Sequence, residues 1–331
     1  MYDIIFDFSS SPVGGGLRRL EAYAEYFSSS PIKVHFLIHA AASNREKIQQ
    51  LVPTTLVHKT TLSKVMLNKN YLKKIVVGSK WLFSYGIPTK SAAAENNWLH
   101  ISNVLPFYIF NTTVDPILFL KMFLLRQQYK FNYHNNDVIS AESNFSINMY
   151  NKVTGWKGET KLLRNGLHRD DPGHEQKQPF AVAIGTHSYK RIDLTYGVFQ
   201  ALKDELGLEK LLIVGDSKRI PRVIRSAADV ETNDFLAEGL LQSRLQSASY
   251  FISTSEVENS SCAVLEGLQY TQNAILSSIP SHQEMVRPDS GRHLNYMGKD
   301  YMIINESDIR DTAMAKWSME IGTMLLRMGF N

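Results

Sequence analysis

The feature that most constrains the fold of this 331-residue chain is a strand–loop–helix pattern in its second half. An apolar run at 250–252 stops in a loop of small polar residues that begins at Ser253. A helix follows, because Val264, Leu265 and Leu268 recur at helical spacing and share one face. Strand, loop and helix in this order form the repeating unit of α/β proteins with parallel sheets.

The loop and the start of this helix carry groups that suit a nucleotide sugar. Ser260 or Ser261 is a candidate N-cap, and a helix start offers unpaired N–H groups and the positive end of a dipole to a phosphate. Glu258 lies in the loop, and Glu266 lies about one turn into the helix. Because an ionised carboxylate accepts hydrogen bonds through two oxygens, each can bind a pair of vicinal hydroxyls.

The spacing of these two carboxylates carries a family resemblance. Glu258 and Glu266, with seven residues between them, resemble the E-x7-E motif of retaining glycosyltransferases of family four. The continuation at 274–284 resembles the family's next strand and its I-P-x-H-x-E turn. The resemblance implies that Glu258 contacts the transferred sugar and that Glu266 contacts the ribose of the donor. Further donor-binding candidates in the loop and helix start are Asn259, Ser260, Ser261, Cys262 and Ala263.

The same resemblance implies an α/β protein of the GT-B fold, with two Rossmann-like domains whose parallel sheets face a central cleft. It covers most of the second half of the chain strongly and the first half weakly. The predicted divisions are an acceptor-side domain at 1–168, a linker at 169–179 and a nucleotide-sugar-binding domain at 180–310. A terminal helix within 311–331 is predicted to pack back towards the first domain.

The second domain opens with a phosphate-binding candidate. Residues 180–185 form an uninterrupted apolar run that is typical of a buried parallel strand. The loop at 186–193 resembles the family's G-T-x-x-P-R-K-N loop, which implies that Gly185 lies at the donor and that Lys190 and Arg191 bind its diphosphate. A leaving nucleoside diphosphate gains negative charge as the glycosidic bond breaks, so fixed cations stabilise that state.

The chain begins with a strand at 2–8, a glycine-rich turn and a helix at 17–27, which together open a Rossmann-like unit. The order G-x-G-x-x-G is absent, which disfavours a dinucleotide-binding dehydrogenase. The turn instead resembles the family's G-G-x-x-R loop. This implies that Gly15, Gly16 and Arg18 lie near the donor phosphates and the acceptor.

A strand predicted at 98–107 contributes two further candidates, because ligands of open α/β sheets gather at the carboxyl ends of strands. This position at the strand end makes Asn103 an acceptor-side candidate, and many relatives in the family carry a histidine near the transferred sugar, which implies a catalytic role for His100. A lone histidine in an apolar strand is more often a core residue, and this alternative stays open.

The remaining patterns predict further elements. Strands are expected at 33–39, 137–143, 211–216, 235–239, 274–279 and 301–304, and helices at 43–51, 116–131, 240–248 and from residue 144 onward.

The composition, with 44% hydrophobic and 21% charged residues, is that of a soluble globular protein. The single cysteine excludes an internal disulfide framework and fits a reducing cytoplasm. We see no signal peptide and no apolar run near the roughly 20 residues that span a bilayer. No D-x-D motif follows a strand, and the family resemblance implies no obligatory metal and no cofactor beyond the donor itself.

The charge is unevenly distributed along the chain. Residues 1–165 hold 19 Lys and Arg against 10 Asp and Glu, a balance of +9, and the remainder holds 17 against 22, a balance of −5. This asymmetry indicates either an anionic partner for the first half, which would be a lipid surface or a lipid diphosphate acceptor, or an ordinary basic surface. The basic amphipathic stretch at 53–80 and the helix at 116–131 are either interfacial or packed on the core.

The predicted function is transfer of a hexose, with retention, from a nucleoside diphosphate sugar to a hydroxyl of a glycan or lipid-linked oligosaccharide. The predicted setting is bacterial O-antigen, capsule or lipopolysaccharide synthesis, in the cytoplasm and peripherally at the anionic inner leaflet, with no nucleic acid partner. Two alternatives remain: a nucleotide-sugar epimerase of the same fold, and a non-catalytic relative that binds a nucleotide or scaffolds other proteins.

Overall fold

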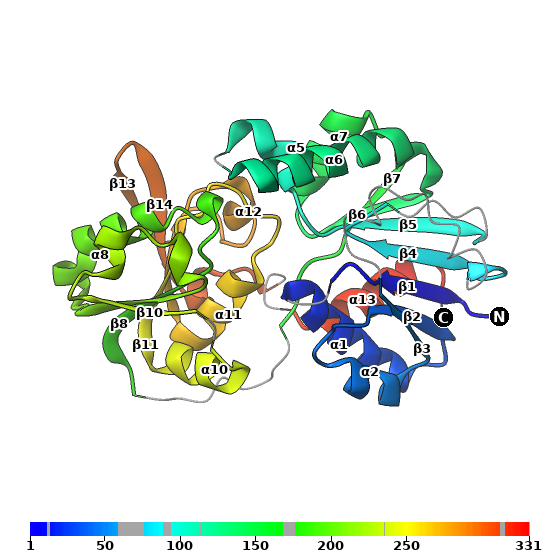
Figure 1. Ribbon diagram of the computed structural model, residues 1–331, viewed down its shortest axis with the longest axis horizontal. Helices are drawn as coiled ribbons and strands as arrows, with labels where there is room; N and C mark the ends of the chain where they lie inside the picture. Colours follow the sequence, from blue (N-terminus) through cyan, green and yellow to red (C-terminus); the bar gives the residue numbers. More distant parts are fainter. Residues whose placement is uncertain are drawn as a thin grey trace. The chain divides into compact units, whose positions relative to one another are not determined.

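The computed structural model describes residues 1–11, 14–58, 76–88, 94–112, 114–167, 176–234, 236–311 and 315–330. The chain forms two compact units, coloured along the sequence in Figure 1. Unit 1 comprises Met1–Ile109, Pro116–His168 and Ala315–Asn331, and unit 2 comprises Phe110–Asp115 and Arg169–Met314.

Unit 1 contains a seven-stranded sheet in the order β3-β2-β1-β4-β5-β6-β7, in which every neighbouring pair is parallel. Its strands are β1 Ile4–Phe8, β2 Val34–His39, β3 Thr54–Val57, β4 Trp81–Tyr85, β5 Asn96–Ile101, β6 Val138–Ala141 and β7 Glu159–Leu162. The inner strands are apolar because they are buried on both faces. Phe6 is central to this core, with its ring 4.9 Å from Phe36 and 5.1 Å from Phe83.

The helices of unit 1 form two packed groups (Figure 1). The first group is α1 Gly15–Ser28, α2 Arg45–Leu51 and α13 Trp317–Arg327, and the second is α5 Leu105–Tyr108, α6 Pro116–Asn132 and α7 Asn144–Thr154. Helix α7 starts where the Ser143 hydroxyl accepts a hydrogen bond from the Ser146 amide. It ends at Gly155, whose φ of 77° suits a glycine.

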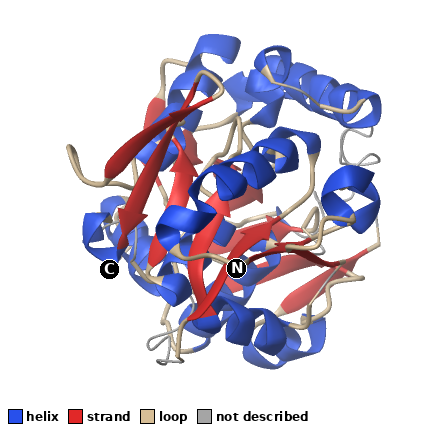
Figure 2. Ribbon diagram, turned by 90° about the vertical axis from the view of Figure 1, so that its left-hand side faces the viewer, coloured by secondary structure: helices blue, strands red, loops and turns tan. Residues whose placement is uncertain are grey.

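Unit 2 contains a second seven-stranded sheet, in the order β10-β9-β8-β11-β12-β14-β13. Its strands are β8 Gln178–Ile184, β9 Lys210–Val214, β10 Val230–Asn233, β11 Ala248–Ser253, β12 Asn273–Ser277, β13 Arg292–Tyr296 and β14 Lys299–Asn305. The first five strands in this order pair in parallel, whereas β14 runs antiparallel to both β12 and β13. This hairpin forms one edge of the sheet. Figure 2 shows the chain turned by 90°, with helices in blue and strands in red.

The strand order of unit 2 reverses between β8 and β11, which are neighbours in the sheet. In α/β sheets a ligand binds at such a switch point, outside the carboxyl ends of the two strands. The helices of this unit are α8 Ile192–Leu206, α9 Arg222–Arg225, α10 Glu238–Ser247, α11 Cys262–Thr271 and α12 Pro280–Gln283. The loops that leave β8 and β11 therefore lead into α8 and α11 at the expected ligand position.

Several predicted bounds differ from the structure. The strand predicted at 235–239 is wrong, because β10 lies at 230–233 and α10 already begins at Glu238. The strand predicted at 98–107 ends at Ile101, and residues from Leu105 onward form α5. Strand β8 starts within the predicted linker, whose residues 169–175 lie outside the described part.

Other segments were not foreseen. Strands β3, β4, β7 and β13 were not predicted, and residues 59–75 of the basic stretch at 53–80 lie outside the described residues. Residues 110–115, inside the predicted first domain, cluster with unit 2, and α13 packs against α1 in unit 1. Among the described helices, none has the length and apolarity that crossing a membrane requires.

Candidate functional site

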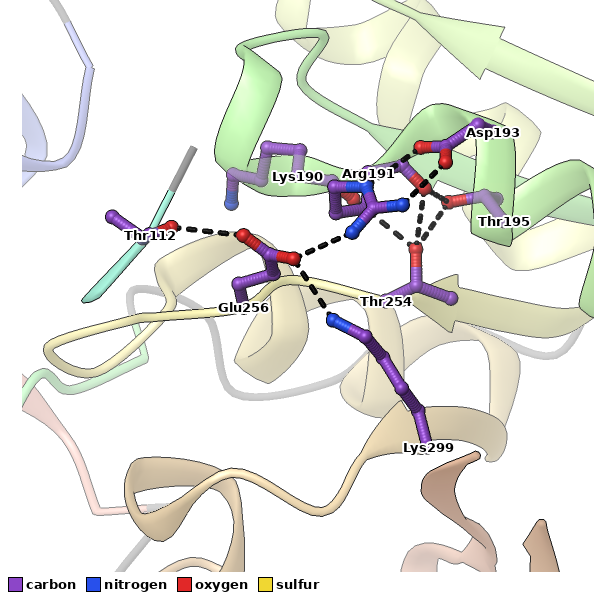
Figure 3. Close-up of polar contacts among 8 residues, drawn as sticks. All are labelled: Thr112, Lys190, Arg191, Asp193, Thr195, Thr254, Glu256 and Lys299. Atoms are coloured by element: carbon purple, nitrogen blue, oxygen red, sulfur yellow. Dashed lines mark hydrogen bonds and ion pairs between the residues drawn. The ribbon is translucent and has the colours of Figure 1, made fainter. Parts of the chain in front are cut away.

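The two loops at the switch point of unit 2 are tied together through Thr254 (Figure 3). Its hydroxyl lies 3.1 Å from the carbonyl oxygen of Lys190 and 2.9 Å from that of Arg191. It also lies 2.7 Å from the hydroxyl of Thr195 on α8, and the Glu256 amide donates to the Tyr189 carbonyl. The loop after β11 thus holds the backbone of the loop after β8 in place.

Lys190 and Glu258 form an ion pair at the centre of this site. Their side chains are only 14% and 12% exposed, and the Ser255 hydroxyl donates to the same Glu258 oxygen over 2.8 Å. Burial alone raises the pKa of Glu258, but the charge and hydrogen bond of Lys190 outweigh it and lower that pKa. Burial alone would lower the pKa of Lys190, but the charge and the hydrogen bond of Glu258 outweigh burial and raise that pKa. Both groups are therefore charged at neutral pH.

Gly185, at the end of β8, makes room for this lysine. Its φ is 93°, a backbone conformation that residues with a side chain rarely adopt. A Cβ atom built there would lie 3.3 Å from Cε of Lys190. A glycine is therefore favoured here for two reasons: its backbone conformation, and the Lys190 side chain that lies close to where a Cβ atom would be.

Arg191 is held by two carboxylates that the sequence analysis did not select (Figure 3). Asp193 accepts from its Nε over 2.9 Å and from its Nη2 over 2.6 Å, and Glu256 accepts from its Nη1 over 2.5 Å. The hydrogen bonds from Arg191 lower the pKa of Asp193. Arg191 also adopts a left-handed backbone, with φ 53°, directly before α8.

Glu256 links three parts of unit 2 (Figure 3). Besides Arg191, its Oε1 accepts from Lys299 Nζ over 2.8 Å, and its Oε2 accepts from the Thr112 hydroxyl over 3.0 Å. Lys299 opens β14, and Thr112 belongs to the segment 110–115. With Lys190, Asp193 and Glu258, these side chains give a cluster of three cations and three carboxylates. An incoming diphosphate would compete with those carboxylates for the cations.

Helix α11 begins beside this cluster. The Ser261 hydroxyl accepts from the Val264 amide over 3.4 Å, so Ser261 is the N-cap, one of the two predicted candidates. Asn259 and Ser261 are buried, whereas Ser260, Cys262, Ala263 and Glu266 are half-buried. The structure thus gathers all the second-half candidates on the loops and helix starts at the switch point.

His282, in the I-P-S-H turn, is fully buried near Glu258. Its Nδ1 lies 2.9 Å from the Ser277 carbonyl oxygen, so Nδ1 carries the proton and donates there. Its Nε2 has no hydrogen-bond partner among the described residues. Burial lowers the pKa of His282, against the opposing effect of Glu258, so the ring is neutral.

The first-half candidates belong to unit 1. Gly15 opens α1, and a Cβ at Gly16 would come within 2.8 Å of Tyr85 Cε1 and closer still to Ser11. Arg18 is half-buried on α1. Asn103 accepts from the Leu105 amide over 2.9 Å, so it shapes the turn into α5. Their predicted roles near the donor and the acceptor stay predictions.

His100 lies wholly within the core of unit 1. Its Nε2 accepts from the Arg19 guanidinium, and its Nδ1 donates to the Ser140 hydroxyl over 2.9 Å. Burial and then the Arg19 charge hold the pKa of His100 well below its usual range. This position matches the alternative of a core histidine, and the catalytic role of His100 stays a prediction.

Arg19, rather than its neighbour Arg18, is the buried cation of unit 1. Its Nη2 lies 3.2 Å from Glu142 Oε1 and donates to Asn165 Oδ1 over 2.9 Å, and its guanidinium lies 4.6 Å from the Trp317 ring. Glu142 and Asn165 lie far along the chain, so no local sequence signal marks these contacts. Asp193 could have been found, because an acid in the first turn of a helix is a recognised pattern.

No three His, Cys, Asp or Glu side chains cluster as a metal site requires anywhere in the described ranges. The absence of a metal in the reaction remains a prediction.

No family model matches the chain, and no curated protein matches its sequence. Solved structures do resemble it. HepE of Anabaena, in complex with UDP and glucose, is 13% identical with a TM-score of 0.63, over 99% of this chain and 95% of that one. TarM is 11% identical with a TM-score of 0.66, over 100% and 92%. A glycosyltransferase from Rickettsia africae is 13% identical with a TM-score of 0.61, over 87% and 85%.

These likenesses confirm the predicted fold class. The chain is an α/β protein of the GT-B fold, with two Rossmann-like domains built on sheets rich in parallel strands. At such low identity the likeness extends to the fold alone.

Proposed function

We propose that this protein is a retaining glycosyltransferase that moves a hexose from a nucleoside diphosphate sugar to a hydroxyl group. The observation that carries the proposal is the placement of Lys190, Arg191 and Glu258 on the two loops at the switch point of unit 2. Nucleotides bind at this position in open α/β sheets. HepE, which shares the fold, has been solved with UDP and with UDP-glucose, which supports a donor of this class.

The proposed roles follow from charge and position. Lys190 and Arg191 bind the diphosphate and stabilise the charge that it gains as the glycosidic bond breaks. Glu258 accepts hydrogen bonds from sugar hydroxyls, and Glu266 accepts them from the ribose. Backbone amides at the start of α11 supply further donors to the phosphate or sugar.

The proposed chemistry needs no nucleophile from the protein. The acceptor oxygen bonds to the anomeric carbon on the face that the leaving diphosphate vacates, and the acceptor proton passes to the leaving phosphate oxygen. Retention rests on the E-x7-E resemblance of Glu258 and Glu266. No metal takes part in the proposed reaction.

The acceptor that we propose is a glycan or a lipid-linked oligosaccharide of bacterial surface polysaccharide synthesis, met at the inner face of the cytoplasmic membrane. The basic first half of the chain supports an anionic acceptor or surface. An epimerase would instead release product without any acceptor, and a scaffold protein would turn over no donor.

The first test is a thermal-shift panel with UDP, GDP, ADP and dTDP. A ligand that binds only the folded state raises the melting temperature. We expect one nucleotide to do so, and we expect a Lys190→Ala, Arg191→Ala variant to lose the shift. A Lys203→Ala, Arg292→Ala variant, which removes two other ion-paired cations of unit 2, should keep it. Absence of any shift in the wild type would overturn the proposed donor site.

A further inference from the structure

Helix α6 packs on unit 1 along one side and exposes large apolar side chains along another. Of its 17 residues only Leu125 and Tyr129 are buried. Ile117 is 70% exposed, Leu120 58% and Phe131 71%. Large apolar side chains that are exposed together on one helix mark an interaction site, so this side calls for a partner.

Ile117, Leu120 and Phe131 share one face of α6 with Leu124, whereas Phe119, 37% exposed, lies on another side of the helix. At 100° per residue, Ile117, Leu120, Leu124 and Phe131 fall within an arc of about 60°, turned away from Leu125 and Tyr129. Leu124 is half-buried. With a rise of 1.5 Å per residue, the face from residue 117 to residue 131 is about 21 Å long. We call these four residues the outer face of α6.

Lysines flank the outer face on both sides. Lys121 lies about 70° from its centre in one direction, and Lys130 lies about 110° away in the other. Both are exposed, and neither forms an ion pair with any residue that the structure describes. Arg126 instead donates to the Pro106 and Phe107 carbonyl oxygens over 3.2 and 3.1 Å. The helix carries no acidic residue.

We propose that the outer face of α6 lies on an anionic lipid bilayer, with its axis along the surface. Ile117, Leu120 and Phe131 would enter the boundary between head groups and acyl chains, while Lys121 and Lys130 contact lipid phosphates. The positive charges of Lys121 and Lys130 complement anionic lipid head groups, and this complementarity is the reason for choosing a bilayer as the partner. A second copy of the chain fits poorly, because antiparallel pairing of two such helices places both Lys121 side chains on one side of the pair and both Lys130 side chains on the other, like charge beside like charge.

This proposal deepens the membrane contact of the proposed function by naming the helix that makes it, and lipid binding can be tested apart from the transfer reaction. The test uses the full chain and measures flotation with vesicles of phosphatidylcholine, with or without phosphatidylglycerol. We expect binding to the anionic vesicles at least about tenfold stronger than to the neutral ones, and weakened by salt. An Ile117→Ser, Leu120→Ser, Phe131→Ser variant should lose about tenfold or more of that binding.

Two further variants make the test specific. Val223→Ser, Leu240→Ser, Met297→Ser removes equally exposed apolar side chains from unit 2 and should bind vesicles like the wild type. Lys121→Gln, Lys130→Gln should reduce both the binding and its salt dependence. Circular dichroism checks that each variant is folded.

Three results would overturn the proposal. The first is a wild-type chain that does not float with anionic vesicles, and the second is equal flotation of the Ile117, Leu120 and Phe131 variant. The third is a wild-type dimer in analytical ultracentrifugation that this variant converts to a monomer, which would assign the face to a second copy.

Discussion

At the scale of single residues, the balance of charge around Arg191 stands out. Three carboxylates engage three cations in the proposed diphosphate site, and Glu256 alone contacts two of the cations. Such contacts hold the Arg191 guanidinium in one orientation. They also mean that a diphosphate replaces existing ion pairs rather than meeting free cations, which weakens its net binding.

Glu256→Gln should therefore tighten the binding of the nucleoside diphosphate. The change removes one negative charge from a cluster in which three carboxylates balance three cations. Asp193 still holds Arg191 in place. We expect the dissociation constant to fall about three- to tenfold, with a steeper salt dependence. Isothermal titration calorimetry at two salt concentrations measures both, with the ion-paired surface residue Glu231, changed to Gln, as the control. Weaker binding would mean that Glu256 chiefly positions Arg191.

At the scale of elements, the buried ion pair of unit 1 joins α1 to the chain that leaves β6. Arg19 is 0% exposed and Glu142 is 4% exposed. Arg19 also packs on Trp317, so the same guanidinium contacts α13. Removing one partner of a buried pair leaves an uncompensated charge, which costs far more than the pair contributes as a whole.

Arg19→Leu should lower the free energy of unfolding by about 3–5 kcal/mol, because Glu142 is left charged and buried. The double variant Arg19→Leu, Glu142→Leu should recover a large part of that loss. Urea unfolding followed by circular dichroism gives the values, and Arg45→Ala, with a guanidinium 46% exposed, is the surface control. Equal losses in the single and double variants would contradict this account.

At the scale of the whole molecule, each unit carries one fully buried histidine whose pKa is lowered. Burial is the main cause for both His100 in unit 1 and His282 in unit 2. In the unfolded chain a histidine has a pKa of about 6.5. Below that pH the unfolded chain binds protons that the folded chain does not, so stability is present above pH 6.5 and falls as the pH falls.

We expect the free energy of unfolding to drop below pH 6.5 by up to about 1.4 kcal/mol per pH unit for each of these two histidines. His100→Gln and His282→Gln should each reduce that slope, whatever they do to stability at neutral pH. Urea unfolding from pH 8 to pH 5 gives the slope, and His293→Gln, at an exposed position, should leave it unchanged. A slope that neither variant alters would refute the assignment of this pH dependence to His100 and His282.

Most central elements of both sheets could be predicted from the sequence. Strands such as β1, β8 and β9 are apolar runs because they are buried on both faces. The loops that follow them begin with small or polar residues. The missed or misplaced strands β3, β7, β10 and β13 lie at the edges of the sheets and are half-exposed, so their apolar signal is weak. Strand β4 was also missed, although its apolar run carried the signal.

From the amino-acid sequence alone, the resemblance carried by residues 258–284 indicated the fold class, and strand and helix periodicity located the loops of the candidate site, because both are local properties of the chain. Which charges meet depends on the three-dimensional fold. Arg191 and Glu256 are 65 residues apart, and Arg19 and His100 are 81 residues apart. Such partners depend on the order of strands in the sheet, which no local pattern encodes. For the same reason, the sequence alone could not show that the ring of His100 lies in the core against Arg19.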